Sequence, residues 1–307
     1  MSSTRKLWLL IALPAIAAAV ALGFQQREAG PAANASPFAA ARAFEDLGAI
    51  VGFGPRPAGS RNLALARDYI LAELREAGLE PVVDAFPAQT PVGEIEMANI
   101  RAIRPGRRDE TIAVAGHYDT KRFDFAFVGA NDGGSSTALL LELARATRDL
   151  ELDHSLEFIF FDGEEAVREW TATDSLYGSR FDIDRRYDEG TLGDLRALVL
   201  VDMIGDRDLE ILEEAASAEW LRTLIWETAA DLGYGAHFGA RRAAIEDDHV
   251  PYLNAGIPAI DLIDFDYPYW HTPEDTLDKT SGESLKVVGD VLYHVLPKID
   301  ARLTSAE

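Results

Sequence analysis

Three apolar segments of this sequence are each followed directly by acidic residues or histidine. The residues at these three ends are His117 and Asp119, then Glu164 and Glu165, then Asp202. Carboxylates and neutral imidazoles suit a catalytic zinc ion, which takes three protein ligands and keeps one position open. Because burying several acids together without a cation is costly, the pattern predicts a metal site.

Further polar residues of the same kinds lie in loops. Asp132 stands in the glycine-rich segment 129–134, and His271 stands in segment 269–275. Segment 246–249 adds three acids and a histidine, among them Asp247. Of the adjacent acids Glu164 and Glu165, one can hold a metal while its neighbour moves protons.

Each of these residues also has an ordinary structural interpretation. His117 alone is typical of a hydrogen-bonded loop histidine, and Asp132 before two glycines is typical of a turn or helix cap. Trp170 and Trp270 are compatible with core aromatics. The functional hypothesis depends on the joint pattern, in which successive strands each end in a potential ligand.

The elements that must position these residues are short apolar strands alternating with amphipathic helices. Strands are predicted at 80–86, 96–103, 111–116, 156–161, 197–201 and 258–263, and helices at 38–51, 60–77, 135–147, 218–232 and 284–296. This alternation predicts one doubly wound α/β domain with a mostly parallel, twisted mixed sheet flanked by helices. In such sheets, sites form at the carboxyl ends of the strands.

Composition narrows the classes of function. The 307 residues include no cysteine, so disulfides and thiolate ligands are excluded and any zinc must be held by His, Asp and Glu. The 52 acidic residues exceed the 29 basic ones, giving a formal charge of −23. That charge argues against nucleic acid as a partner. It favours solubility and attracts cationic partners, including peptides with a free α-ammonium group.

The N-terminus has the pattern of an export signal. Arg5 and Lys6 precede an uncharged apolar run at 7–24, and an Ala/Gly/Pro-containing linker follows. The length of the run lies between a signal-peptide core and a minimal membrane-spanning helix, and a buried core helix is the third interpretation. We expect residues 1–35 to be a signal peptide or membrane anchor plus linker, and residues 36–307 to be a catalytic domain in the periplasm or outside the cell.

The order of the polar residues resembles the M28 metallopeptidase family. That family's pattern is His-x-Asp, an Asp in a Gly-rich loop, Glu-Glu after a strand, then Asp, then a distal His. The matching residues here are His117 and Asp119, Asp132, Glu164 and Glu165, Asp202, and His271.

A finer resemblance is to the glutaminyl-peptide cyclotransferases, the cyclase branch of that fold. It rests on segments 117–121, 160–166, 174–180, 201–205, 246–251 and 270–272, together with Trp170. The resemblance implies one zinc ion held by Asp132, Glu165 and His271, with Glu164 as the proton shuttle. It also implies that Asp202 and Asp247 are hydrogen-bonded partners of Glu164 and that Trp170, Tyr267 and Trp270 line a glutamine pocket.

The expected function is conversion of an N-terminal Gln of peptides or proteins to pyroglutamate, by a protein that we expect to be a monomer. The alternative is an M28-type aminopeptidase in which His117, Asp132 and Asp202 add a second metal and Glu164 activates water. The loop 131–135 is more similar to the aminopeptidase loop than to the animal cyclase loop, so the number of metal ions stays open. A third hypothesis, an inactive peptide-binding module, is disfavoured by the complete ligand set.

Overall fold

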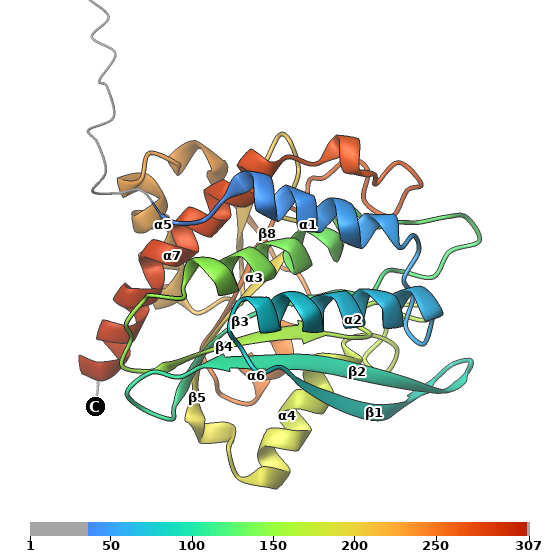
Figure 1. Ribbon diagram of the computed structural model, residues 1–307, viewed down its shortest axis with the longest axis horizontal. Helices are drawn as coiled ribbons and strands as arrows, with labels where there is room; N and C mark the ends of the chain where they lie inside the picture. The colour runs from blue at the N-terminus through green and yellow to red at the C-terminus, as the bar shows by residue number, and fades with distance from the viewer. Residues whose placement is uncertain (1–35, 306–307) are drawn as a thin grey trace, which may run out of the picture. The chain divides into compact units, whose positions relative to one another are not determined.

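A six-stranded mixed sheet forms the centre of the computed structural model, which describes residues 36–305 (Figure 1). The strand order is β1-β2-β4-β3-β5-β8. β2 is antiparallel to both of its neighbours, and β4, β3, β5 and β8 are parallel. The strands are β1 (Val82–Thr90), β2 (Gly93–Arg104), β3 (Thr111–His117), β4 (Ser155–Phe161), β5 (Leu195–Asp202) and β8 (Ala259–Ile263). The predicted α/β fold is confirmed.

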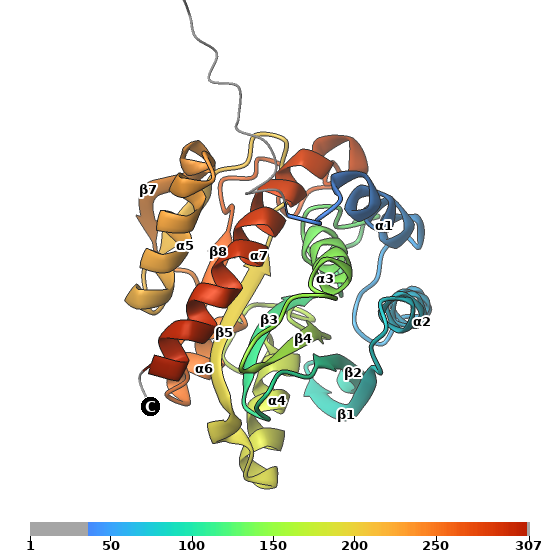
Figure 2. The same ribbon diagram turned by 60° about the vertical axis from the view of Figure 1, so that its left-hand side comes forward.

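Helices cover both faces of this sheet, as Figure 2 shows. One face packs against α1 (Ala40–Gly52), α2 (Arg61–Glu76), α3 (Gly134–Ala146), α5 (Glu219–Asp231) and α7 (Gly282–Ser305). The other face packs against α4 (Tyr177–Glu189) and α6 (His249–Asn254). Single-turn 3₁₀ helices lie at Leu192–Asp194, Gly235–His237 and Leu277–Lys279. A small parallel sheet of β6 (Ile211–Glu214) and β7 (Phe238–Ala243) contacts β8.

The core follows from side-chain alternation along the central strands. In β3, Val114 packs with the α1/α3/α7 layer, whereas Ala113 and Ala115 pack toward α4 and α6. All seven residues of β3 and of β4 are buried, as expected for parallel strands covered on both faces. Two buried faces explain why these segments are predominantly apolar rather than alternating. The exception is Glu157 in β4, which is buried and paired with Arg186 at 2.8 Å.

Several boundaries differ from the sequence prediction. β1 continues past the predicted residue 86 to Thr90. The strand tolerates Pro87 because β1 lies at the edge of the sheet. α7 continues past residue 296 through Pro297 to Ser305, since buried Ile299 and Leu303 hold its last turns against the core.

Four elements were not predicted at all: α4, α6, β6 and β7. α4 is mostly polar and buries only a few side chains, and α6 and β6 are too short to show a period. The N-terminal signal or anchor predicted at residues 1–35 lies outside the described residues. None of the helices within residues 36–305 combines the length and the hydropathy that a membrane span requires.

Candidate metal and catalytic site

The predicted site residues meet at the carboxyl ends of β3, β4 and β5. His117 is the last residue of β3, Asp202 is the last residue of β5, and Glu164 and Glu165 follow β4. Asp132 lies in the loop before α3, and His271 lies in the loop after β8. The parallel strands therefore bring together residues that are far apart in the sequence, as the sequence pattern predicted.

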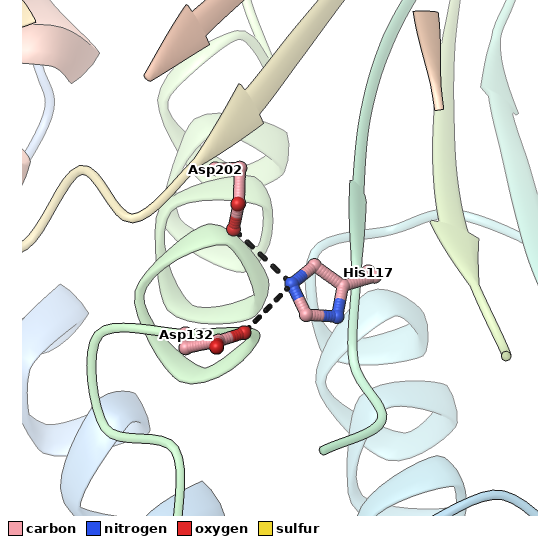
Figure 3. Close-up of side chains that lie close together, drawn as sticks. All are labelled: His117, Asp132 and Asp202. Atoms are coloured by element: carbon pink, nitrogen blue, oxygen red, sulfur yellow. Dashed lines mark hydrogen bonds and ion pairs between the residues drawn. The ribbon is translucent and has the colours of Figure 1, made fainter. Parts of the chain in front are cut away.

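One cluster consists of His117, Asp132 and Asp202 (Figure 3). Nε2 of His117 lies 3.1 Å from Oδ1 of Asp202 and 3.3 Å from Oδ1 of Asp132. Figure 3 shows both carboxylates aimed at this same ring nitrogen. Burial alone lowers the pKa of His117, but Asp202 and Glu164 raise it well above its ordinary value.

A second cluster consists of Asp132, Glu165 and His271. Nε2 of His271 lies 3.2 Å from Oε1 of Glu165 and 3.3 Å from Oδ2 of Asp132. One imidazole N–H cannot satisfy two carboxylates, and Oδ2 of Asp132 is buried without a hydrogen-bond partner among the described residues. A cation at the centre of these three groups would satisfy the orphaned oxygen. The donor set of two carboxylates and one imidazole fits zinc.

Supporting residues hold both clusters in place. Asp119 accepts hydrogen bonds from the backbone N–H groups of Glu164 (3.2 Å) and Glu165 (3.4 Å). Asp275 accepts hydrogen bonds from the backbone N–H of Asp132 at 3.2 Å and from the hydroxyl of Tyr267 at 2.8 Å. Such hydrogen bonds from surrounding groups fix the orientation of metal ligands.

A buried arginine stabilises the loop that carries Asp132. The guanidinium of Arg56 is fully buried and donates hydrogen bonds to five backbone carbonyls. They belong to Ile50, Gly54, Tyr118, Val128 and Gly129. Burial lowers the pKa of Arg56 to about 10, which still leaves it charged at neutral pH.

Gly133, directly after Asp132, must be glycine for two reasons. Its φ of 76° lies in the left-handed region, and an added Cβ would lie 2.5 Å from the carbonyl oxygen of Asp119. The missing side chain lets the Asp132 loop pack against the end of β3. The glycine-rich sequence around Asp132 is thus a packing requirement of the site.

Glu164 has the electrostatic environment of a proton carrier. Burial raises its pKa well above the ordinary value, His117 opposes this effect, and Glu165 and Asp247 add to it. Oε2 of Glu164 lies 3.8 Å from Nδ1 of His117. A carboxyl group with a raised pKa can both accept and return a proton near neutral pH.

The two carboxylates expected to be hydrogen-bonded to Glu164 have other hydrogen bonds in this structure. Asp202 accepts from Nε2 of His117 and, at 2.8 Å, from the N–H of Met203. Asp247 accepts from the N–H of Asp248 at 2.5 Å. Burial raises the pKa of Asp202 to about 7, with His117 opposing. Asp202, Asp247 and Glu164 line one cavity. Asp247 acts on Glu164 through its charge and not through a hydrogen bond in this structure.

That cavity has a volume of about 440 Å³ and aromatic walls. Its apolar lining residues are Trp170, Met203, Ala244, Ile245, Ile263, Phe265 and Trp270. The ring of Trp270 stacks on His271 with the ring centroids 4.2 Å apart. The ring centroid of Phe265 lies 4.8 Å from that of Trp270. The indole N–H of Trp170 donates to Oε2 of Glu246 at 3.0 Å.

Tyr267 has a different position from the one expected. It is buried, and it lies outside the described lining of the cavity. Its hydroxyl donates to Asp275, which in turn accepts the N–H of Asp132. Through Asp275, Tyr267 therefore supports the loop that carries Asp132, and it is not one of the described lining residues of the cavity.

Backbone strain in the described part of the chain is concentrated at this site. Leu176, Met203 and His271 are the non-glycine residues with positive φ, at 53°, 47° and 55°. Met203 follows Asp202, and the N–H of Leu176 donates to the carbonyl of Glu164 at 2.8 Å. Such residues cost on the order of 1–3 kcal/mol each and persist where the surrounding structure holds them.

Comparison with known proteins agrees with this geometry. The model of the family described as Peptidase family M28 matches residues 99–296. The glutaminyl-peptide cyclotransferase of Bos taurus is 31% identical, over 75% of this chain and 75% of its own length. The crystal structure of Acidobacteriales bacterium glutaminyl cyclase is 38% identical, with a TM-score of 0.83 over 89% of this chain and 98% of that one. The chain belongs to the glutaminyl-peptide cyclotransferases of peptidase family M28.

The same M28 fold also carries peptidases. A Zn-dependent exopeptidase from Parabacteroides distasonis is 26% identical, with a TM-score of 0.78 over 86% of this chain and 99% of that one. The similarity to this peptidase is lower in both identity and TM-score than the similarity to the Acidobacteriales cyclase. A metal ion is thus consistent with the family and with both acidic clusters.

Several residues of this cyclotransferase site were missed by sequence reasoning. Phe265 and Ile245 line the cavity but have no pattern of their own in the sequence, and Glu246 stood out only as a member of the acidic segment 246–249, without a role of its own. Lys121 also lines it, with Nζ 3.1 Å from Oε2 of Glu165. Arg56 stands in a turn-rich segment, and only its complete burial reveals its role.

Proposed function

We propose that this protein is a zinc-dependent glutaminyl-peptide cyclotransferase, which converts the N-terminal Gln of peptides to pyroglutamate and releases ammonia. The observation that carries the proposal is a single cavity in which indoles flank the Asp132–Glu165–His271 cluster and Glu164. A small amide-bearing side chain fits flat apolar walls that also carry polar groups.

Asp132, Glu165 and His271 are the proposed ligands of one zinc ion, because their atoms converge and Oδ2 of Asp132 is otherwise unsatisfied. When bound, the ion supplies a Lewis acid that polarises the carboxamide oxygen of the substrate. Lys121, which contacts the other oxygen of Glu165, helps to keep that carboxylate in its orientation.

Glu164 is the proposed proton shuttle. The α-amine of the substrate attacks its own side-chain carboxamide carbon, and Glu164 takes the proton that the amine must lose. A new C–N bond forms. When the original bond to nitrogen breaks, Glu164 returns the proton and ammonia leaves. The attack is intramolecular because both groups belong to one glutamine, and binding between Trp170 and Trp270 holds the side chain curled for it. Intramolecular attack by a well-oriented group is worth about 7–11 kcal/mol relative to a bimolecular one.

Asp202 and Asp247 are proposed to tune this shuttle. Asp247 raises the pKa of Glu164 through its charge, and Asp202 orients His117, which faces Glu164. We assign Tyr267 a positioning role through Asp275 instead of direct contact with substrate.

An M28-type aminopeptidase is the second candidate function, and one observation favours it. His117, Asp132 and Asp202 form a second cluster whose atoms could hold another ion, with Asp132 shared between the clusters. Two neighbouring metals are typical of hydrolases that activate water. Incubation of the purified protein with a Gln-initiated peptide separates the functions. We expect loss of one ammonia from an intact peptide, whereas release of free Gln would support the aminopeptidase.

We also propose that residues 1–35 direct export and that residues 36–307 act as a monomer in the periplasm or outside the cell. The support is the basic pair and apolar run in the sequence. A fusion to a reporter that is active only outside the cytoplasm should be active. Recovery of intact chain only in the cytosol would contradict export, and gel filtration with light scattering tests the monomer.

A further inference from the structure

A second cavity of about 200 Å³ lies beside the catalytic one. The two cavities share one lining residue, Glu246. The apolar part of the second lining consists of Ala172, Leu176, Val250 and Pro251. Glu246 therefore stands at the boundary between the two spaces.

The walls of the second cavity continue the chain segments that carry the catalytic acids. The N–H of Leu176 donates to the carbonyl of Glu164 at 2.8 Å. On the other side, the N–H of Val250 donates to the carbonyl of Asp247 at 2.9 Å. The second cavity is therefore positioned by the same backbone as the reacting groups and has a defined place relative to them.

Three of the four polar side chains that line this cavity have hydrogen bonds, those of Ser175, Arg180 and Glu246, and Asn254 is the fourth. Arg180 donates to the carbonyls of Ala172 (2.7 Å) and Leu176 (3.2 Å), and its guanidinium lies 5.1 Å from the ring centroid of Tyr177. Oε2 of Glu246 accepts from Trp170. The surface left for a ligand is thus mainly that of Ala172, Leu176, Val250 and Pro251, which suits an apolar side chain.

We propose that this second cavity is a substrate subsite that binds an apolar side chain located after the N-terminal Gln of the peptide. This proposal rests on the proposed function, the cyclisation of N-terminal Gln. It adds that the protein prefers substrates with an apolar residue soon after that Gln. Glutamine fills the catalytic cavity, the chain passes Glu246, and an apolar side chain from one of the next residues enters between Ala172 and Val250.

Cyclisation kinetics of a peptide series test the subsite. The substrates are glutaminamide, which ends at the Gln, the peptide Gln-Ala-Ala-Ala-amide, and three versions with Leu at position 2, 3 or 4. We expect Leu at one of these positions to raise kcat/KM about tenfold over Ala, the scale of burying part of an apolar side chain. Val250→Asp and Ala172→Asp should each remove this gain, measured in each variant as the ratio of kcat/KM for the Leu peptide to kcat/KM for Gln-Ala-Ala-Ala-amide.

Val83→Asp is the matched control, because Val83 is equally apolar but 41% exposed on β1. This variant should keep the Leu gain. Equal rates for all four peptides, or a Leu gain that survives in both Val250→Asp and Ala172→Asp, would overturn the subsite. Ala172 is exposed, so Ala172→Asp keeps the test valid if Val250→Asp unfolds. Failure of the wild-type protein to cyclise glutaminamide overturns the proposed function itself, and this result is distinct from a missing Leu gain.

Discussion

Asp132 directs one carboxylate oxygen at His117 and the other at His271. Oδ1 lies 3.3 Å from Nε2 of His117, and Oδ2 lies 3.3 Å from Nε2 of His271. Asp132 is therefore common to both clusters of potential metal ligands, and we expect metal binding to depend on it more than on any other residue of the two clusters.

The first prediction concerns metal content. We expect about one zinc per chain after dialysis, as for a three-ligand catalytic site. Asp132→Asn should lose that zinc because it removes a charged ligand, whereas His117→Ala should retain it. Elemental analysis of the wild type and both variants provides the measurement. A stoichiometry of two, with one ion lost in His117→Ala and one in Asp202→Ala, would contradict the single-zinc proposal.

The second prediction separates the two adjacent acids after β4. Glu164→Gln should keep zinc but slow cyclisation by about 10²–10⁴-fold, since the amide cannot accept the amine proton. The loss should appear in kcat more than in KM. Glu165→Gln serves as the matched variant and should lose zinc. Zinc content and rate are measured side by side, and loss of metal only in Glu164→Gln would show that the two roles are exchanged.

The third prediction concerns Arg56. Arg56→Lys should weaken zinc binding and lower the thermal midpoint, because one ammonium cannot replace a fork that contacts five carbonyls. Each buried carbonyl left unpaired costs about 1–3 kcal/mol. Arg61→Lys, at an exposed position at the start of α2, is the control and should change neither quantity. Thermal unfolding and zinc titration of both variants check the prediction. A thermal midpoint and a zinc affinity of Arg56→Lys equal to those of the wild type would refute it.

The fourth prediction is a pH dependence of stability at Glu214. Burial alone raises the pKa of Glu214, but hydrogen bonds from His249, Ala216 and Ser217 lower it to about 2. Because the pKa is lower in the folded state, the stabilisation is complete above the unfolded value near 4.5 and is lost as the pH falls toward 2. The free energy of unfolding of the wild type should exceed that of Glu214→Gln by on the order of 2–3 kcal/mol at pH 7.

Chemical denaturation between pH 7 and pH 3 measures this difference. The gap in unfolding free energy between wild type and Glu214→Gln should narrow as the pH decreases. Glu210→Gln changes an exposed acid nearby and keeps Glu214, so its unfolding free energy should stay close to that of the wild type at every pH from 7 to 3. A gap that stays the same from pH 7 to pH 3 would show that the carboxylate of Glu214 has no such effect.

The sequence alone determined the fold class and most of the site. The buried strands β3, β4 and β5 are covered on both faces, so they appear in the sequence as predominantly apolar runs despite Glu157 in β4 and Arg196 in β5. Since parallel strands end at one edge of a sheet, the polar residues that follow them had to meet. For this reason His117, Glu164, Glu165 and Asp202 could be placed together without coordinates.

Only the tertiary structure decided which oxygen faces which nitrogen and which side chains close the cavity. Tyr267 stands three residues before Trp270, yet it hydrogen-bonds to Asp275 behind the site while Trp270 lines the cavity. Arg56 and Phe265 acquire their roles through contacts with segments distant in the sequence. Periodicity reports the face on which a residue of a regular element lies, but loop side chains have no such period. Their positions follow from packing between distant segments, which only the folded chain brings together.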